Sequence, residues 1–420
     1  MFPYGGYAGK GLYVNLTRGT IESRALDKAL IEDYLGGNGF GTRLLWDQVG
    51  PEVDPLGPEN LLIFAHGPLC GTTMPTSSRM EVIAKSPLTG IYGDANAGGF
   101  FGPELKFAGW DLVVIRGQAS QPVYLSISDD RAELRDAAGL WGLPTSQTEA
   151  AIRSELCDPQ IKTATIGPAG ENQVRFAGIQ VTSQRSAARC GLGAVMGAKQ
   201  LKAIAVRGHG PVRVADPARF IDVTARLHRR TRDNAIFPAV SAHGTPGIAA
   251  LMDALGRFPT RNFQMGAFPE IARIDADALE GRAMVRHLAC FGCTVACDKL
   301  HYLPDGPYAG TTLRSVEYET LSSLGSGVWN ADLDSILAAN RLCDELGMDT
   351  ISAGRAISFA MELWDEEILN RDDTGGLALH WGDEEMTLQL LKMIAHREGF
   401  GDLLAEGVRR AAQVIGRGAE

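Results

Sequence analysis

The sequence predicts an α+β fold in which a β-rich N-terminal domain, residues 1–210, precedes a mainly helical domain, residues 211–420. Short apolar or alternating runs, typical of strands, dominate the first half. Apolar residues at helical spacing dominate the second half. Between the halves, Gly and Pro interrupt the segment RGHGPVRVADP, residues 207–217. A chain of 420 residues is long enough for two such domains.

The first half begins with a predicted hairpin. In GLYVNLT, Leu12, Val14 and Leu16 alternate with their neighbours, and RGT turns the chain into a second strand. Further strands are predicted for short apolar runs bounded by Gly, Pro, Asp or Ser, at residues 61–67, 79–85, 111–117, 122–128 and 201–208. Helices are predicted at residues 28–35 and 146–156.

The second half contains one long amphipathic helix, predicted for residues 330–347. Asn330 can cap its start, and Gly347 stands where a left-handed residue ends a helix. Asp349 then suits the N-cap of the next helix. Helices are also predicted at residues 351–368, 386–397 and 402–415.

The charge balance narrows the classes of partner. The chain has 40 basic and 50 acidic residues, a net charge of −10, and we find no Lys/Arg-rich block. Nucleic acid is therefore not an expected partner, because phosphate binding requires a basic footprint. No apolar run is long enough for a membrane helix, and the first residues lack a signal-peptide pattern. We expect a cytoplasmic protein without membrane insertion.

Three of the seven cysteines form a C-x2-C-x3-C array: Cys290, Cys293 and Cys297. Clustered thiols in a chain without a disulfide framework indicate a metal site. The array can supply three ligands to an iron–sulfur cluster. It can equally supply three ligands to zinc, with His287 or His301 as the fourth. The spacing alone does not decide between these metals.

Other segments suggest a ligand with phosphate groups. Arginines precede glycines in RSAARCGLGAVMGAK, residues 185–199, which fits an anion site at a helix start or a plain packing turn. Residues 77–111 are dense in glycine, which suits either close approach to a large flat ligand or loops between strands. Carboxylates at Asp344 and Asp349 could accept hydrogen bonds from a heterocycle. Glu317 and Glu319 are candidates for a general base or are plain surface carboxylates.

Together, these segments resemble the aldehyde:ferredoxin oxidoreductase family of tungsten-pterin enzymes. The resemblance covers essentially the whole chain, in the family's order. It rests on five segments: SRMEVIAKSPLTGIYGDANAGGFFGPELKFAGWD, RSAARCGLGAVMGAKQLKAI, CFGCTVAC, EYET and CDELGMDT. Five ordered matches are far more specific than any single one.

The resemblance implies a tungsten (or molybdenum) bis-pyranopterin cofactor, held by a tungstopterin-binding domain at residues 1–210. Two segments match the family's pterin-phosphate sites: Arg79, Asn96 and Gly98, and Arg185, Ser186, Ala188 and Arg189. Main-chain carbonyls of Asn96 and Ser186 would help to hold a magnesium ion that bridges the pterin phosphates. One of the family's two D-x-x-G pterin motifs is matched by Asp344, Met348 and Asp349.

The resemblance also assigns the metal ligands. Cys290, Cys293 and Cys297 would bind a [4Fe-4S] cluster, and Glu319 matches a carboxylate near the tungsten. In the family, the fourth cluster cysteine lies in the second D-x-x-G motif, within the last third of the chain. We find no such motif before Glu420. We therefore expect a fragment without the third domain, with an apolar face exposed.

The activity that the resemblance implies is oxidation of a small aldehyde to a carboxylic acid with water. Electrons would pass from the tungsten centre through the cluster to ferredoxin, and a homodimer is one compatible assembly. A reductive relative, such as the tungsten subunit of a benzoyl-CoA reductase complex, is an alternative. A truncated, non-catalytic homologue that binds zinc or no metal is the other.

Overall fold

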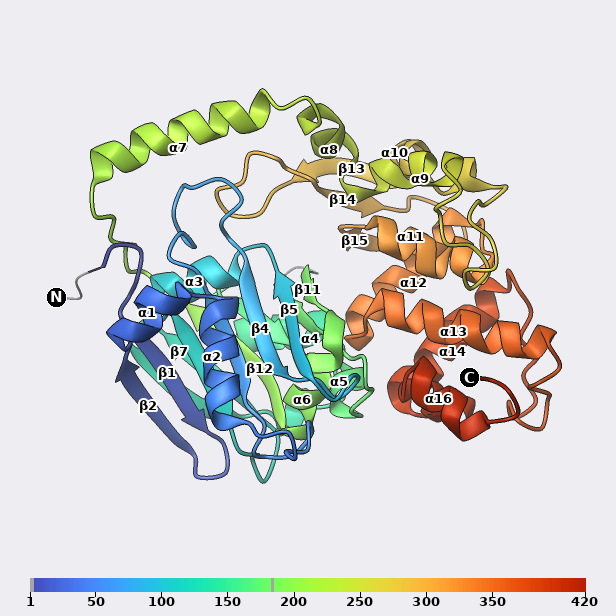
Figure 1. The fold of residues 1–420 in the computed structure, drawn as a ribbon, viewed down its shortest axis with the longest axis horizontal. Helices are drawn as coiled ribbons and strands as arrows, with labels where there is room; N and C mark the ends of the chain where they lie inside the picture. Colours follow the sequence, from blue (N-terminus) through green and yellow to red (C-terminus); the bar gives the residue numbers. More distant parts are fainter. Residues whose placement is uncertain (1–3, 183–184) are drawn as a thin grey trace. The chain divides into compact units, whose positions relative to one another are not determined.

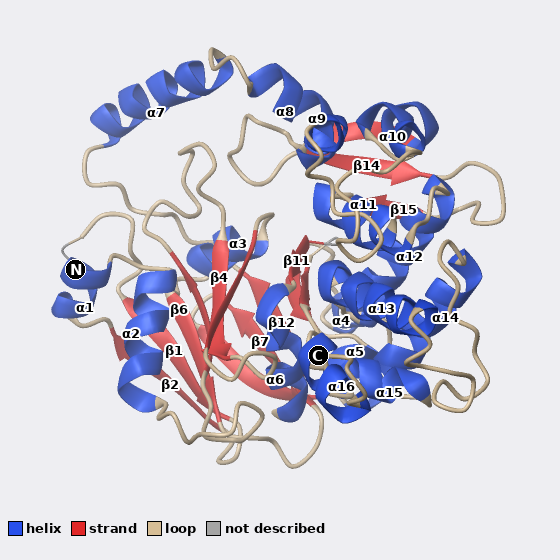
Figure 2. Ribbon diagram, turned by 45° about the vertical axis from the view of Figure 1, so that its right-hand side comes forward, coloured by secondary structure: helices blue, strands red, loops and turns tan. Residues whose placement is uncertain are grey.

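The structure, a computed structural model, describes residues 4–182 and 185–420. The described residues separate into two compact units. The first unit contains residues 4–173, 177–234 and 289–295. The second unit contains residues 174–176, 235–288 and 296–420. Strands predominate in the first unit and helices in the second (Figures 1 and 2), which confirms the predicted α+β class.

Two six-stranded sheets form the framework of the first unit. The first sheet has the order β2 (Thr20–Ala25), β1 (Lys10–Asn15), β6 (Leu112–Arg116), β3 (Leu62–His66), β4 (Met80–Lys85), β5 (Tyr92–Ala97). The second has the order β11 (Arg185–Ala187), β10 (Ile179–Val181), β9 (Lys162–Thr165), β12 (Leu201–Arg207), β7 (Val123–Ser128), β8 (Arg131–Asp136). Pairs β1–β6 and β7–β12 are parallel, whereas the other neighbours are antiparallel.

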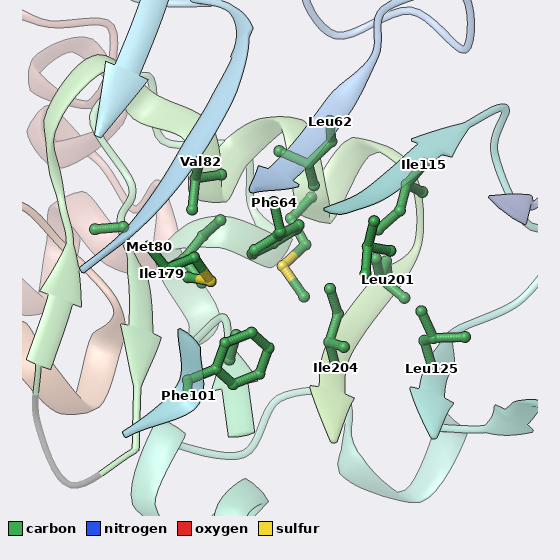
Figure 3. Close-up of a cluster of buried hydrophobic side chains, with 14 of the residues drawn as sticks. Leu62, Phe64, Met80, Val82, Phe101, Ile115, Leu125, Ile179, Leu201 and Ile204 are labelled. Carbon is green, nitrogen blue, oxygen red and sulfur yellow. The ribbon is translucent and has the colours of Figure 1, made fainter. Parts of the chain in front are cut away.

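The main core of the first unit lies between the two sheets. Figure 3 shows Phe64 and Val82 of the first sheet near Leu125 and Ile204 of the second, with Phe101 among them. Helices cover the remaining surfaces or connect strands: α1 (Lys28–Tyr34), α2 (Asn38–Gln48), α3 (Phe101–Phe107), α4 (Thr145–Glu155), α5 (Pro168–Glu171), α6 (Leu192–Ala198) and α7 (Pro217–Arg232). Separate apolar clusters join α1 and α2 to the first sheet and α4 to the second.

The predicted hairpin and the five later strands of the first half are present, as are both predicted helices. The glycine-dense segment at residues 77–111 is not a run of loops. It contains β4, β5 and α3 and ends at the buried Asp111. Asp111 pairs with Lys106, whose Nζ lies 2.6 Å from Asp111 Oδ1.

The second unit consists of helices and one small antiparallel sheet. The sheet has the order β13 (Met284–Leu288), β14 (Asp298–Tyr302), β15 (Thr312–Arg314). The helices are α8 (Phe237–His243), α9 (Ala249–Ala254), α10 (Ala276–Ala283), α11 (Tyr318–Leu324), α12 (Leu333–Leu346), α13 (Thr350–Asp365), α14 (Glu384–His396), α15 (Phe400–Ala405) and α16 (Val408–Ile415). No helix in the described part of the chain is long and apolar enough to cross a membrane.

Two helix predictions in the second half were wrong in detail. The long helix starts after Asp332, whose carboxylate accepts from Ser335 N. Asn330 lies before the helix, and its side-chain oxygen accepts from Asp332 N. The helix expected over residues 402–415 is two helices, because Gly407 has φ 84° and ψ 157° and interrupts the hydrogen-bond ladder between α15 and α16.

Candidate cofactor-binding site

The two predicted phosphate-binding segments lie side by side in the first unit. Asn96 of the first segment lies in β5, and Arg185 and Ser186 of the second lie in β11. These are the outer strands of their sheets, and they are in contact. A Cβ atom on Gly99 would lie 3.5 Å from Arg185 Cγ. The structure therefore brings the segment of Arg79, Asn96 and Gly98 next to that of Arg185 and Ser186, although about 90 residues separate them in sequence.

Polar side chains gather where β4 begins and β5 ends. Arg79 Nη1 donates to Asn96 Oδ1, and Asn96 lies directly opposite Glu81 in the strand register. Burial raises the pKa of Glu81, the charge of Asp94 adds to this, and Arg79 opposes it. Glu81 Oε2 is buried and has no hydrogen-bond partner in the described part of the chain. Such an arrangement suits a site that receives a donor from a ligand.

Glu81 was not among the predicted site residues. A signal was present, because R79-x-E81 and D94-x-N96 both follow the period of two that places side chains on one face of a strand. Which face of each strand is polar becomes clear only once β4 and β5 are paired.

The second phosphate segment is a sharp turn between β11 and α6. Gly191 adopts a left-handed conformation, φ 73°, at the start of α6, and Cys190 has φ 66°. Ser86 Oγ donates to Cys190 O at 2.7 Å, and Gln180 Nε2 donates to Ser186 Oγ at 3.2 Å. This turn precedes the first amides of α6, an arrangement that favours anions. Ala188 and the exposed Arg189 lie at this turn.

Part of the cysteine array lies against the first phosphate segment. Cys290 Sγ is only 2.8 Å from the position that a Cβ atom on Gly98 would take. Phe291 N donates to Gly99 O at 3.2 Å, and Cys293 N donates to Cys290 O at 3.1 Å. Bare glycine backbone at Gly98 and Gly99 therefore allows the loop to approach.

Aromatic contacts anchor the same loop. The Phe291 ring packs edge-on against Phe107 and Phe100, with centroids 5.6 and 6.5 Å away. Gly292 adopts φ 64°, and a Cβ atom there would lie 3.1 Å from Thr72 O. The backbone of the cysteine loop is thus fixed by its packing, while Cys290 and Cys293 remain partly accessible.

Cys297 belongs to the second unit and is exposed. Burial lowers the pKa of neighbouring Lys299. The charge of Cys297 raises that pKa, and it is the strongest of the effects that oppose burial. The described residues contain no group of three Cys, His, Asp or Glu side chains already arranged around a metal position. Three soft thiols on one short segment still fit the donor set of an iron–sulfur cluster.

The two histidines proposed as zinc ligands, His287 and His301, do not form a ligand group with the cysteines in the described residues. His287 is exposed, and its Nδ1 lies 3.1 Å from Ser241 O. His301 is buried, and burial lowers its pKa to about 4. Neither ring joins the cysteines in a ligand group within the described residues.

The predicted pterin motif of the second unit forms a tight acidic turn. Asp344, near the end of α12, is buried, and its Oδ2 accepts from Asn340 Nδ2 at 3.0 Å. Gly347 follows with φ 74°, and Met348 is buried. Asp349 caps α13 by accepting from Ile351 N and Ser352 N at 3.1 Å, as predicted.

Cys343 lies beside this turn and is completely buried within α12. Burial raises the pKa of its thiol well above the ordinary value, and the charges of Asp344 and Asp349 add to the shift. Cys343 is therefore a neutral packing residue, because metal binding requires the thiolate.

Glu319 lies in the first turn of α11 with its side chain exposed. The adjacent Tyr318 ring packs edge-on against Phe258 at 5.5 Å, and burial, followed by the charge of Glu319, raises the pKa of Tyr318. Burial lowers the pKa of Arg355, and the charge of Glu319 is the leading influence against this shift. A carboxylate near a cation and a phenol can accept or hold a proton.

Comparisons with known proteins identify the family. Residues 11–208 match the family "Aldehyde ferredoxin oxidoreductase, N-terminal domain", and residues 222–420 match "Aldehyde ferredoxin oxidoreductase, domains 2 & 3". The chain belongs to the aldehyde ferredoxin oxidoreductase family. This membership confirms the resemblance found in the sequence motifs, and it makes the chain a relative of named oxidoreductases.

Two relatives of this aldehyde ferredoxin oxidoreductase family member are named "Tungsten-containing aldehyde ferredoxin oxidoreductase". The protein from Pyrococcus abyssi is 44% identical over 412 residues, and that from Pyrococcus horikoshii is 43% identical over 412 residues. Each alignment covers 97% of this chain and 67% of the relative.

A solved structure of another redox enzyme is also similar. It is titled "Active site complex BamBC of Benzoyl Coenzyme A reductase in complex with 1,5 Dienoyl-CoA", and it is 35% identical with a TM-score of 0.88. The similarity covers 99% of this chain but 64% of the solved chain. This chain therefore spans slightly less than two thirds of that protein.

Proposed function

We propose that this chain takes part in the oxidation of an aldehyde to a carboxylic acid, with water as the oxygen source. The observation that carries the proposal is the contact between Gly98 and Cys290, since it joins a predicted cofactor-phosphate segment to a predicted cluster ligand. The 44% identity to a tungsten-containing aldehyde ferredoxin oxidoreductase over 97% of the chain supports the same chemistry.

In this proposal, a bound tungsten bis-pterin supplies the two-electron redox chemistry, and a [4Fe-4S] cluster supplies one-electron transfer to ferredoxin. The chain supplies binding and orientation. Arg79, Asn96 and the turn at Arg185–Arg189 would hold phosphate groups and magnesium. Asp344, Met348 and Asp349 would contact the pterin, and Cys290, Cys293 and Cys297 would bind the cluster.

Glu319 is the proposed catalytic residue. Its exposed carboxylate can take a proton from water or hold the aldehyde carbonyl through a bound proton. Tyr318 beside it can donate a hydrogen bond, since its raised pKa keeps the phenol protonated at neutral pH.

A second candidate is reduction of an aromatic thioester. The similarity to the benzoyl-CoA reductase structure, at 35% identity, supports it. Assays of the purified protein with a set of aldehydes and with benzoyl-CoA separate the two reactions. A non-catalytic homologue that binds zinc would turn over neither substrate.

The deciding experiment combines metal analysis with one substitution, Cys293→Ser. We expect anaerobically purified protein to contain tungsten or molybdenum and about four iron atoms for each cluster-loaded chain. Cys293→Ser should remove most of the iron and abolish ferredoxin reduction. The control is Cys157→Ser, because Cys157 is exposed in the same unit and lies outside the array.

Two results would contradict the proposal. One is a Cys293→Ser protein that keeps its iron and its rate. The other is parent protein that contains zinc and neither tungsten nor molybdenum, which would support the non-catalytic homologue.

A further inference from the structure

Helix α7 carries an unusual charge for this chain. Its sixteen residues include five arginines and a single aspartate, whereas the whole chain has a net charge of −10. Four of the arginines and His228 fall in the segment RLHRRTR, residues 226–232. The expectation that the chain has no Arg-rich block was therefore wrong, because the total composition masks this short run.

These arginines are directed to solvent. Thr224 is the one buried residue of α7, and Arg226, Arg229, Arg230 and Arg232 are all exposed. Arg226 pairs with Asp222 at 3.3 Å. Among the described residues, Arg229, Arg230 and Arg232 have no ion-pair partner. Cations stabilise a helix C-terminus, which accounts for one or two of them but not for the whole cluster.

The arginine cluster lies next to the cysteine loop. His228 Nε2 donates to Thr73 O at 2.9 Å, and His228 Nδ1 lies 3.4 Å from Thr294 Oγ1. Thr294 directly follows Cys293, and Thr72 O faces Gly292 of the same loop. His228 thus connects the middle of the arginine cluster to the segment that carries two of the predicted cluster ligands. All of these residues belong to the first unit.

An apolar hollow of about 360 Å³ is lined in part by residues of α7. The residues that line it include Leu69, Phe220 and Val223 together with Arg219. Figure 1 draws α7 as a long helix that stands apart from the sheets of its unit. An apolar centre with a charged rim is the usual composition of a protein-binding surface.

We propose that the arginine face of α7 and the adjacent hollow form the docking surface for a small acidic redox protein. The inference rests on the proposed function and specifies where the electron acceptor binds. Oxidation of one aldehyde with one water yields a carboxylic acid, two protons and two electrons. A one-electron acceptor would therefore have to bind twice for each aldehyde, and a cluster held by the cysteine loop would supply one electron to it each time.

Charge favours this partner over others. A chain with net charge −10 repels an acidic protein over most of its surface, so a local cluster of unpaired arginines determines where such a protein makes contact. Nucleic acid is less favoured because it needs a broader basic surface. Electron-transfer encounters are small and brief, which suits a surface of one helix and one shallow hollow.

The test uses the holoenzyme and the double variant Arg229→Glu/Arg230→Glu. The matched control is Arg18→Glu/Arg131→Glu, which makes the same charge change at an exposed turn and at the exposed first residue of β8 in the same unit. The acceptors are a purified acidic [4Fe-4S] ferredoxin and the small dye benzyl viologen. At ionic strength of about 0.01 M, kcat/KM for ferredoxin should fall about tenfold or more in the α7 variant alone. The rate with dye should stay unchanged in both variants, and the difference should vanish near 1 M salt, where the screening length is about 3 Å.

Direct binding of the same ferredoxin, measured by calorimetry, separates the two proposals. If the parent protein oxidises no aldehyde even with dye, the proposed function fails, but weaker ferredoxin binding by the α7 variant alone still supports the docking surface. Equal ferredoxin kinetics and binding in all three proteins would overturn it. So would α7-dependent binding of duplex DNA or anionic vesicles without binding of ferredoxin.

Discussion

Gly98 and Cys290 lie close together in the candidate site. A methyl group on Gly98 would lie 2.8 Å from Cys290 Sγ, well inside the sum of the van der Waals radii. Gly98→Ala should therefore displace the cysteine loop, lower the iron content of the purified protein and cost about 1–3 kcal/mol of stability. Iron analysis and thermal unfolding measure the two effects.

Gly139→Ala is the matched control for this change. No heavy atom lies within 4 Å of the added methyl group, and Gly139 lies in the same unit. This control should keep its iron and its melting temperature. Full iron content in Gly98→Ala would mean that the loop does not depend on the bare backbone at Gly98.

Sequence patterns predicted individual site residues better than they predicted the contacts between those residues. The cysteine spacing and the Gly98 motif were evident from the letters, but the contact between Cys290 and Gly98 joins segments about 190 residues apart. Glu81 was missed for the same reason, because its position opposite Asn96 depends on strand register. Asp349 was predicted as an N-cap, since capping is a local property.

The acidic turn between α12 and α13 depends on one glycine. Gly347 adopts φ 74° and ψ 47°, a conformation in which a Cβ atom is unfavourable. Gly347→Ala should lower the free energy of unfolding by about 1 kcal/mol. It should also shift Asp344 relative to Asp349 and reduce tungsten or molybdenum content. Urea denaturation and metal analysis test both effects.

Gly281→Ala is the control, and it should change the free energy of unfolding in the opposite direction. Gly281 lies within α10, and nothing lies within 4 Å of an added Cβ atom. Alanine is the better helix former, so this change should stabilise the second unit by about 0.5–1 kcal/mol. If Gly347→Ala were equally stabilising, the turn would not require a left-handed residue.

Helices and strands were predicted where periodicity is strong and uninterrupted. The apolar spacing of residues 402–415 continues across Gly407, so pattern alone gave one helix where the backbone makes two. Strand β5, with the sequence YGDANA, lacks the large apolar residues typical of strands. It is a strand because β4 pairs with it along its full length. Tertiary pairing overrides propensity at such sites.

For the chain as a whole, five motifs in order predicted the family, and the family matches at residues 11–208 and 222–420 confirm it. Total composition was a poorer guide. The net charge of −10 does not reveal the basic end of α7, because the seven residues 226–232 contribute little to a charge count over 420 residues. Local charge must therefore be assessed against position in the fold.

Both units contain a histidine that is buried in the neutral form. Burial, helped by the charge of Lys106, lowers the pKa of His66 to about 3, and burial lowers the pKa of His301 to about 4. The unfolded chain binds protons at these rings below about pH 6.5, whereas the folded chain does not. As the pH falls from about 6.5 towards the folded pKa, each buried histidine therefore lowers the free energy of unfolding. Above about pH 6.5 it has no such effect.

Acidification should accordingly destabilise the protein, and His66→Gln should weaken that dependence in the first unit. Glutamine can still donate to Trp110 O, which lies 2.9 Å from His66 Nε2, but it does not titrate. Between about pH 6 and pH 4, the parent should lose about 1.4 kcal/mol per pH unit for each buried histidine, and the variant should lose that much less. Urea midpoints at several pH values measure the slope, and the exposed His396→Gln is the control. Equal slopes for the parent and His66→Gln would show that His66 takes up its proton without unfolding.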